Sequence, residues 1–299
     1  MRCWCCDGGG DRVTPVTGVR YDAAGNRGLG SQTVSDVIKL YRRRKLDSTF
    51  NHLGQPVGLP VPDWYPPSFP ARAPLSGRYC QIEPLDTERH AEDLHAAYRL
   101  DTEGRLWTYL PYGPFENFQD FSLWMEEVSK QADPLYFAIV HQTTGKATGM
   151  AAFLRIDPKN GSIEVGGLCF SPLLQRTVSG TEAMFLMMEY AFSLGFRRYE
   201  WKCNALNAPS RASAERLGFT FEGIFRQATV VKGHNRDTAW YSVLDREWPD
   251  LRKRFLEWLD PENFDPSGQQ KTRLGLRTGL EDRNSGGCCQ ILSAKGARR

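Results

Sequence analysis

The residues best suited to chemistry follow an apolar, strand-like run at 162–170. The loop 171–180 leaves that run and opens directly into an apolar helical segment. Backbone N–H groups at the start of a helix have no partners within the helix, and the helix dipole favours anions there. Gln175 and Arg176 add side-chain donors, and Gly180 permits a close approach to the backbone. The segment therefore predicts a phosphate or pyrophosphate site, with a plain surface loop as the alternative for these residues taken alone.

Cysteine also suggests chemistry, because a thiolate with a histidine base can carry an acyl group. No sequence feature links any of the five histidines to Cys169, which lies in an apolar run, so we interpret it as a small buried side chain. The other cysteines stand singly or near the chain ends, which is typical of a reducing compartment. Those at positions 3, 5 and 6 have no partners at metal-finger spacing, so no metal site is predicted.

The elements that must position the loop alternate between strand and helix patterns. In chain order we expect strand 78–84, helices starting near Thr87 and Phe118, strands 135–140, 147–156 and 162–170, helix 181–192, strand 198–203, a helix ending before Gly218, and strands 220–225 and 238–244. Helix 181–192 is apolar nearly all round and is expected in the core. The predicted fold class is α/β with a mixed α+β sheet, in which a mostly antiparallel N-terminal meander is followed by strand–helix–strand units.

The composition changes along the chain and divides it into four parts. Residues 1–55 are expected to be a disordered basic, Gly-rich tail, with one short helix pattern at 34–46. Residues 56–76 are rich in proline and are expected to form a linker or arm. The folded domain is expected at 77–260, and 261–299 is expected to be a second flexible tail.

The overall composition excludes several classes of protein. The chain has 299 residues, 40% of them hydrophobic, and a formal net charge of +3. Its basic residues are not interleaved with aromatic residues along one face, so nucleic-acid binding is not predicted. It has no apolar run long enough for a membrane span and no apolar segment after its first charged residues, so we expect a soluble, unexported, cytoplasmic protein.

Several motifs occur in one order along the chain. They are Trp107-Thr108-Tyr109-Leu110-Pro111-Tyr112, Gln175-Arg176-Thr177-Val178-Ser179-Gly180-Thr181-Glu182-Ala183, Asn207-Ala208-Pro209-Ser210, Glu215-Arg216-Leu217-Gly218-Phe219, and Asp237-Thr238-Ala239-Trp240-Tyr241-Ser242 with Trp248. Together they resemble the GNAT superfamily of N-acetyltransferases, in its RimJ/RimL-like branch. In the family's cofactor loop, Gln175 and Gly180 match the first and last positions, and Val178 stands where the first glycine is usual.

The resemblance implies that acetyl-CoA is the co-substrate. Its pyrophosphate would bind the amides near 176–181, and its pantetheine arm would pair with the edge of strand 162–170. Gly166 and Gly167 would form a bulge that frees amides there, and those amides could also polarise the thioester carbonyl. The implied cofactor-binding residues are Leu168, Cys169, Phe170, Gln175, Arg176, Thr177, Val178, Ser179, Gly180, Thr181, Asn207 and Ser210.

The resemblance also implies catalytic roles. Glu164 would be the base, with an ordinary solvent-facing glutamate as the alternative. Ser210 would stabilise the leaving thiolate and Asn207 would contact pantetheine, although both residue types also suit a helix N-terminus. Tyr241 is a further candidate acid, with packing in a terminal strand as the alternative.

An aromatic loop is implied to wall the acceptor channel through Trp107, Tyr109, Tyr112 and Phe115, although such residues also anchor a loop to its own domain. The acceptor is expected to be a peptide N-terminus or a small-molecule amine, and the protein a monomer or homodimer. The alternative function is a catalytically weakened GNAT-like domain that binds acyl-CoA or a partner protein.

Overall fold

The computed structural model describes residues 48–275, so the helix pattern at 34–46 lies outside the described residues. The chain divides into two compact units, one ending at Trp64 and one beginning at Tyr65. In the first unit, β1 (Ser48–Phe50) and β2 (Pro56–Gly58) pair as an antiparallel hairpin. The side chain of Asn51 accepts the N–H groups of Leu53 and Gln55 in the turn. The boundary expected between residues 55 and 56 therefore falls inside a small structured hairpin.

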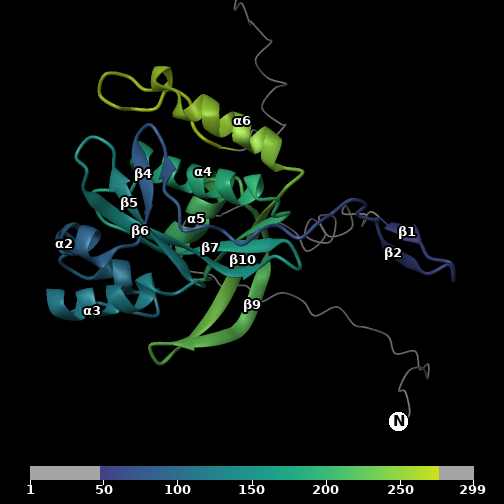
Figure 1. The fold of residues 1–299 in the computed structure, drawn as a ribbon, viewed down its shortest axis with the longest axis horizontal. Coiled ribbons are helices and arrows are strands. Elements are labelled where there is room, and N and C mark those ends of the chain that lie inside the picture. The colour runs from purple at the N-terminus through teal and green to yellow at the C-terminus, as the bar shows by residue number, and fades with distance from the viewer. Residues whose placement is uncertain (1–47, 276–299) are drawn as a thin grey trace, which may run out of the picture. The chain divides into compact units, whose positions relative to one another are not determined.

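The second unit is built on an eight-stranded sheet (Figure 1). Its strands are β3 (Leu75–Ser76), β4 (Cys80–Pro84), β5 (Leu135–His141), β6 (Ala147–Asp157), β7 (Ser162–Phe170), β8 (Arg198–Asn204), β9 (Thr220–Val231) and β10 (His234–Leu244). The spatial order is β3-β4-β5-β6-β7-β8-β10-β9. All neighbours are antiparallel except β7 and β8, which are parallel. The predicted mixed sheet with an antiparallel meander is confirmed.

Four of the helices in the described residues begin at polar side chains that cap them. The described helices are α2 (Thr87–Tyr98), α3 (Phe118–Ser129), α4 (Val178–Ser193), α5 (Ala208–Arg216) and α6 (Trp248–Leu259), with short 3₁₀ helices η1 (Arg105–Trp107) and η2 (Pro261–Asn263). The capping side chains of α2 to α5 are Asp86, Asn117, Thr177 and Asn207. Because Thr177 caps α4, this helix begins at Val178, three residues before the expected start.

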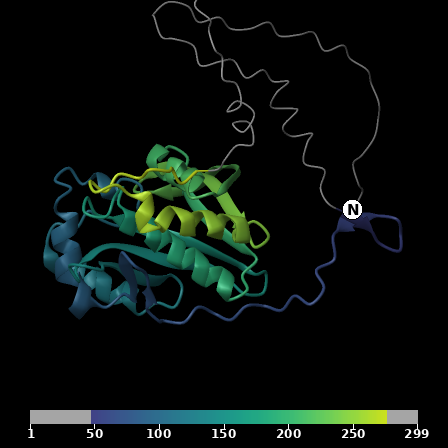
Figure 2. The same cartoon turned by 90° about the horizontal axis from the view of Figure 1, so that it is seen from above.

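Helices cover both faces of the sheet and define two apolar cores. Alternate residues of β5 face opposite sides: Phe137 belongs to the larger core with α4 and α6, and Ala138 to the smaller core with α2 and α3. Figures 1 and 2 show α4 and α6 lying side by side. Helix α4 is buried along most of its length, as its apolar sequence predicts. No helix among residues 48–275 is long and apolar enough to span a membrane.

A buried carboxylate joins α4 to the sheet edge. Glu182 is only 4% exposed and accepts the backbone N–H groups of Arg78 (2.8 Å), Tyr79 (2.6 Å) and Cys80 (2.8 Å). These three donors precede or begin β4, and the bond from Cys80 is buried. Glu182 therefore fixes the start of the sheet against the helix that carries the candidate anion site.

The ordered chain continues past the domain end expected at Asp260. The Asn263 side chain donates to Trp258 O (2.9 Å) and accepts Thr272 N–H (2.8 Å), and Leu274 is buried. The expected flexible tail from residue 261 is thus corrected for 261–275. Hydrogen bonds between polar side chains and the backbone hold this segment in place. Because these bonds need no periodic apolar residues, the sequence pattern gave no sign that the segment is ordered.

Candidate active site

The parallel strands β7 and β8 separate part of the way along their length. They pair from Ser162 opposite Arg198 to Val165 opposite Trp201, and not beyond. A register shift on the other side of β7 coincides with Gly167, whose φ is +57°. A Cβ at Gly167 would lie 2.9 Å from the ring of Tyr136. The bulge expected at Gly166 and Gly167 is confirmed, and it leaves the edge of β7 facing β8 without a strand partner.

A cavity of about 900 Å³ opens where the strands separate. Every predicted cofactor-binding residue except Ser179 lines it: Leu168, Cys169, Phe170, Gln175, Arg176, Thr177, Val178, Gly180, Thr181, Asn207 and Ser210. Ser179 is buried, with its hydroxyl donated to Tyr79 O (3.2 Å). Further lining residues that sequence reasoning missed include Leu106, Met184, Trp201, Ser213, Arg216, Trp258 and Phe264. No Asp, Glu or His of the described chain lines this cavity.

The loop before α4 presents free backbone donors to the cavity. Thr177 Oγ1 accepts Gly180 N–H (3.0 Å), and Gln175 closes the loop by donating its side-chain amide to Phe170 O (2.8 Å). The N–H groups of Arg176, Val178 and Ser179 have no hydrogen-bond partner within residues 48–275. Three free donors at the start of a 16-residue helix form an anion-binding end.

Valine is compatible with the position where the family usually has its first glycine. Val178 is the first residue of α4 and packs against the larger core. Gly180, by contrast, is required by the loop's own packing, since a Cβ there would lie 2.8 Å from Leu174 O. Val178 therefore keeps its N–H free while its side chain faces the core.

The start of α5 brings two further candidates to the same cavity. Asn207 caps the helix by accepting Ser210 N–H (3.2 Å), so the expected capping role is present. Ser210 Oγ accepts the indole N–H of Trp201 (3.1 Å), and the Ser210 side chain also hydrogen-bonds the Cys203 thiol beside the cavity. The cap and the cavity-facing hydroxyl are compatible.

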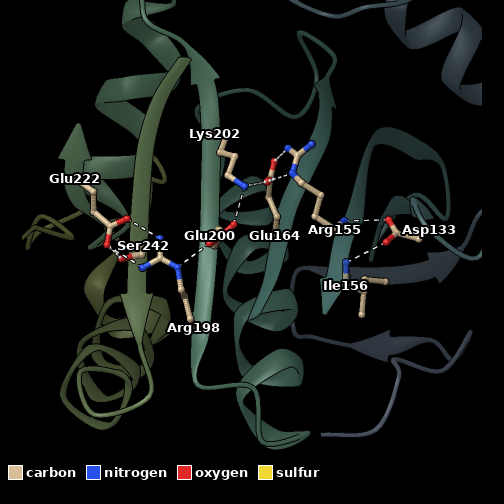
Figure 3. Close-up of polar contacts among 9 residues, drawn as sticks. All are labelled: Asp133, Arg155, Ile156, Glu164, Arg198, Glu200, Lys202, Glu222 and Ser242. Atoms are coloured by element: carbon tan, nitrogen blue, oxygen red, sulfur yellow. Dashed lines mark hydrogen bonds and ion pairs between the residues drawn. The ribbon is translucent and has the colours of Figure 1, made fainter. Parts of the chain in front are cut away.

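Glu164 lies outside the cavity. It is 2% exposed, and its carboxylate binds Arg155 Nε (2.6 Å) and Lys202 Nζ (3.0 Å) (Figure 3). The chain of charges continues from Lys202 to Glu200 (2.7 Å) and from there to Arg198 (2.6 Å). The alternative of a solvent-facing Glu164 is therefore wrong, because Arg155 of β6 and Lys202 of β8 both bind its buried carboxylate.

Tyr241 is also separate from the cavity. It is fully buried in β10, and its hydroxyl accepts Arg211 Nε–H (3.1 Å) and donates to Glu215 (3.2 Å). Burial raises the pKa of Tyr241. Its hydroxyl proton is engaged by Glu215 rather than directed at the cavity.

Cys169 lines the cavity but does not present a thiolate. Cys169 is buried, and desolvation raises the pKa of its thiol to about 12. Its carbonyl accepts the Tyr98 hydroxyl (3.0 Å). The interpretation of Cys169 as a small buried side chain is confirmed.

Most of the aromatic loop belongs to the smaller core. Trp107 is buried and packs edge-on against Tyr98 and Phe115, and Tyr112 packs on Trp124 at 4.5 Å between centroids. Tyr109 differs, because its hydroxyl reaches across to Leu206 O (3.2 Å) in the loop before α5. Trp107, Tyr112 and Phe115 thus anchor the loop to its own domain, which was the alternative expected for them. Tyr109 instead joins this loop to the loop before α5.

The split between β7 and β8 and the free N-terminus of α4 line one cavity. A model of the acetyltransferase (GNAT) domain matches residues 81–220. Over 178 residues the chain is 32% identical to "Putative ribosomal N-acetyltransferase YdaF" of Bacillus subtilis, covering 56% of this chain and 90% of that protein.

Solved structures agree with this relationship. The chain is similar to a GCN5-related N-acetyltransferase from Brucella melitensis, with 48% identity, a TM-score of 0.70, and coverage of 72% of this chain and 97% of that chain. An acetyltransferase of the GNAT family from Chromobacterium violaceum gives 38% identity and a TM-score of 0.61, covering 65% and 98% of the two chains. The chain therefore belongs to the GNAT family of acetyl-CoA-dependent N-acetyltransferases, and its relative from Bacillus subtilis agrees with the RimJ/RimL-like branch.

Proposed function

We propose that the protein transfers acetyl from acetyl-CoA directly to a primary amine in the cavity between β7 and β8. The observation that carries this proposal is the convergence of two unpaired backbone surfaces on one cavity. The free N–H groups of Arg176 and Val178, which line the cavity, suit a pyrophosphate, and the free N–H of Ser179 follows them along α4. The unpaired edge of β7 suits the amide-bearing pantetheine arm, which would add to it as an extra strand does.

The residues of the cavity support a direct transfer. The amine nitrogen attacks the thioester carbon, its new bond to carbon forms, and the carbon–sulfur bond breaks. Backbone N–H groups near Leu168 to Phe170 stabilise the developing oxyanion. The Ser210 hydroxyl donates a hydrogen bond to the departing thiolate, which takes a proton from water, while the amine releases one to water. Thr177 and Asn207 position these groups as helix caps.

We assign Glu164 a positioning role rather than that of a general base. Its two oxygen atoms hold Arg155 and Lys202, and its side chain does not line the cavity. The ion pairs join β6, β7 and β8 at the place where β7 and β8 begin to separate. The acceptor would then react as a neutral amine that has already lost its proton to solvent.

This absence of a cavity base favours a protein N-terminus as acceptor. An α-amino group has a pKa of about 7.7–8.0, whereas a lysine-type amine has one of about 10.4. Near pH 8 a large share of α-amines is neutral without help from the enzyme. The Bacillus subtilis relative is named as a putative ribosomal N-acetyltransferase, which favours a ribosomal protein as acceptor and the cytoplasm as the location. We place the acceptor entrance beside Leu106 and Tyr109.

The function is tested with acetyl-CoA, peptides bearing a free or blocked α-amine, and small amines. We expect thiol release and acetylated peptide in equal amounts for free N-termini near pH 8. Lysine ε-amines should react about 100-fold more slowly at that pH, as their neutral fraction dictates. Blocked peptides should not react. Acetyl-CoA binding with no acetylated product from any amine would instead support the alternative of a binding protein without catalysis.

A further inference from the structure

The cavity continues beyond the start of α4, between α4 and α5, and ends at the segment that follows α6. Arg216 of α5 and Trp258 of α6 line this end, together with Gly268, Gln269 and Gln270. The matched acetyltransferase domain ends at residue 220, so the wall formed by α6 and the segment after it lies beyond that domain. This end of the cavity is therefore lined in part by residues that lie outside the segment matched by the family model.

Arg216 brings an uncompensated positive charge to that surface. It makes no ion pair with any carboxylate in the described part of the chain. Its Nη1 donates to Thr181 Oγ1 (3.2 Å), and its guanidinium lies 5.0 Å over the ring of Trp258. The side chain is thus held between two helices with its remaining donors available to a ligand.

The segment after α6 holds the Trp258 side chain in its position next to Arg216. Gln270 accepts the indole N–H of Trp258 (2.8 Å), and Phe264 pairs with Gln270 in a short bridge. The Asp265 carboxylate accepts the N–H groups of Ser267 and Gln269, each at 2.9 Å. These bonds make a compact loop that keeps Trp258 in place beneath Arg216.

The position of Arg216 relative to the start of α4 suits a ligand that carries two separate phosphate groups. Thr181 lies three residues along α4 from Val178, about 5 Å at the helical rise per residue. Arg216 is therefore close to the free N–H groups of α4 but separate from them. CoA carries a pyrophosphate and, across its ribose, a separate 3′-phosphate, so it would bring two anionic groups to two adjacent sites.

We propose that Arg216, backed by Trp258 and the segment 261–270, forms a subsite for the 3′-phosphate of CoA. This inference rests on the proposed function, because it assumes that the cavity holds acetyl-CoA. Arg216 binds the phosphate, and Trp258 and Gln270 are positioning residues that act through Arg216. Arginine suits the task because its fork of donors matches phosphate oxygens in pairs.

The test compares CoA with 3′-dephospho-CoA by calorimetry for the full chain and for Arg216→Gln. We expect wild type to bind CoA about 10- to 100-fold more tightly than 3′-dephospho-CoA, as a charge-assisted contact gives. Arg216→Gln should remove that preference, while its affinity for 3′-dephospho-CoA stays within about threefold of wild type. Arg246→Gln removes an exposed arginine outside the cavity and should keep the preference. Trp258→Leu should reduce it in part.

The outcomes separate the inference from the function on which it rests. Equal loss of both ligands in Arg216→Gln would overturn the inference, because Arg216 would then serve the pyrophosphate or only shape the cavity. Wild type that binds both ligands equally would also overturn it, while leaving the proposed function intact. A folded wild type that binds neither ligand would overturn both. Circular dichroism and thermal unfolding of each variant confirm that the comparison concerns folded protein.

Discussion

Replacing Glu182 by glutamine is expected to lower the free energy of unfolding by about 3 kcal/mol or more. The carboxylate accepts three backbone N–H groups, from Arg78, Tyr79 and Cys80, at a site that water hardly reaches. Glutamine keeps the shape but turns one acceptor into an NH₂ group that faces donors. At least one backbone N–H would then lose its partner, and bonds to a charged acceptor would become bonds to a neutral one. Urea unfolding followed by circular dichroism measures the change.

Glu189→Gln is the matched control, because Glu189 lies on the same helix and pairs with Arg252 at the surface. An exposed pair of this kind contributes about 1 kcal/mol or less. Similar small losses in both variants would mean that the three N–H groups find other partners, and Glu182 would not be the residue that fixes the start of the sheet.

Replacing Glu164 by glutamine is expected to lower stability by about 2 kcal/mol while leaving kcat within about threefold of wild type. The stability loss follows because the Lys202 side chain is only 6% exposed and would keep Glu200 as its one carboxylate partner among the described residues. The activity should persist because Glu164 does not face the cavity. The measurements are urea unfolding and steady-state acetylation of a peptide across pH 6 to 9.

Glu200→Gln is the control for this prediction, since Glu200 shares Lys202 and pairs with Arg198 without lining the cavity. If both residues only position strands, the two variants should behave alike in stability and activity. A drop in kcat of about 100-fold for Glu164→Gln alone, with a changed pH profile, would identify Glu164 as the general base after all.

Local signals in the sequence predicted much of the fold. The caps at Asp86 and Asn207 are single residues whose side chains bond to N–H groups three positions on, so the sequence contains the whole interaction. Thr177 caps α4 in the same way but was not recognised as a cap, so that helix was expected three residues too late. The bulge at Gly167 is equally local, because its backbone conformation favours glycine. Alternation and length were enough to place the strands of the meander.

Interactions between distant segments could not be predicted in the same way. Glu164 occupies the expected strand, but its partners Arg155 and Lys202 come from the two neighbouring strands. Helix α6 has no side-chain cap, and the segment after it is ordered by Asn263 and Asp265, so neither gave a strong signal. Arg216 lies inside a quoted motif, yet its contact with Trp258 depends on how α5 and α6 pack.

We propose that the free N–H groups at the start of α4 bind the phosphates of acetyl-CoA. Val178→Pro tests it directly, because proline is well accepted at the first position of a helix and removes one of these N–H groups. The preceding residue, Thr177, already has the extended backbone that proline requires (φ −100°, ψ 165°). Val178→Ala is the matched control, because it shortens the side chain and keeps the N–H.

Calorimetric titration of wild type, Val178→Pro and Val178→Ala with acetyl-CoA is therefore the decisive measurement. We predict that the proline variant binds about 10-fold more weakly than wild type, as the loss of one charge-assisted bond requires. The alanine variant should bind within about twofold of wild type. Equal affinities for the proline and alanine variants, both folded, would contradict the placement of the phosphates at α4.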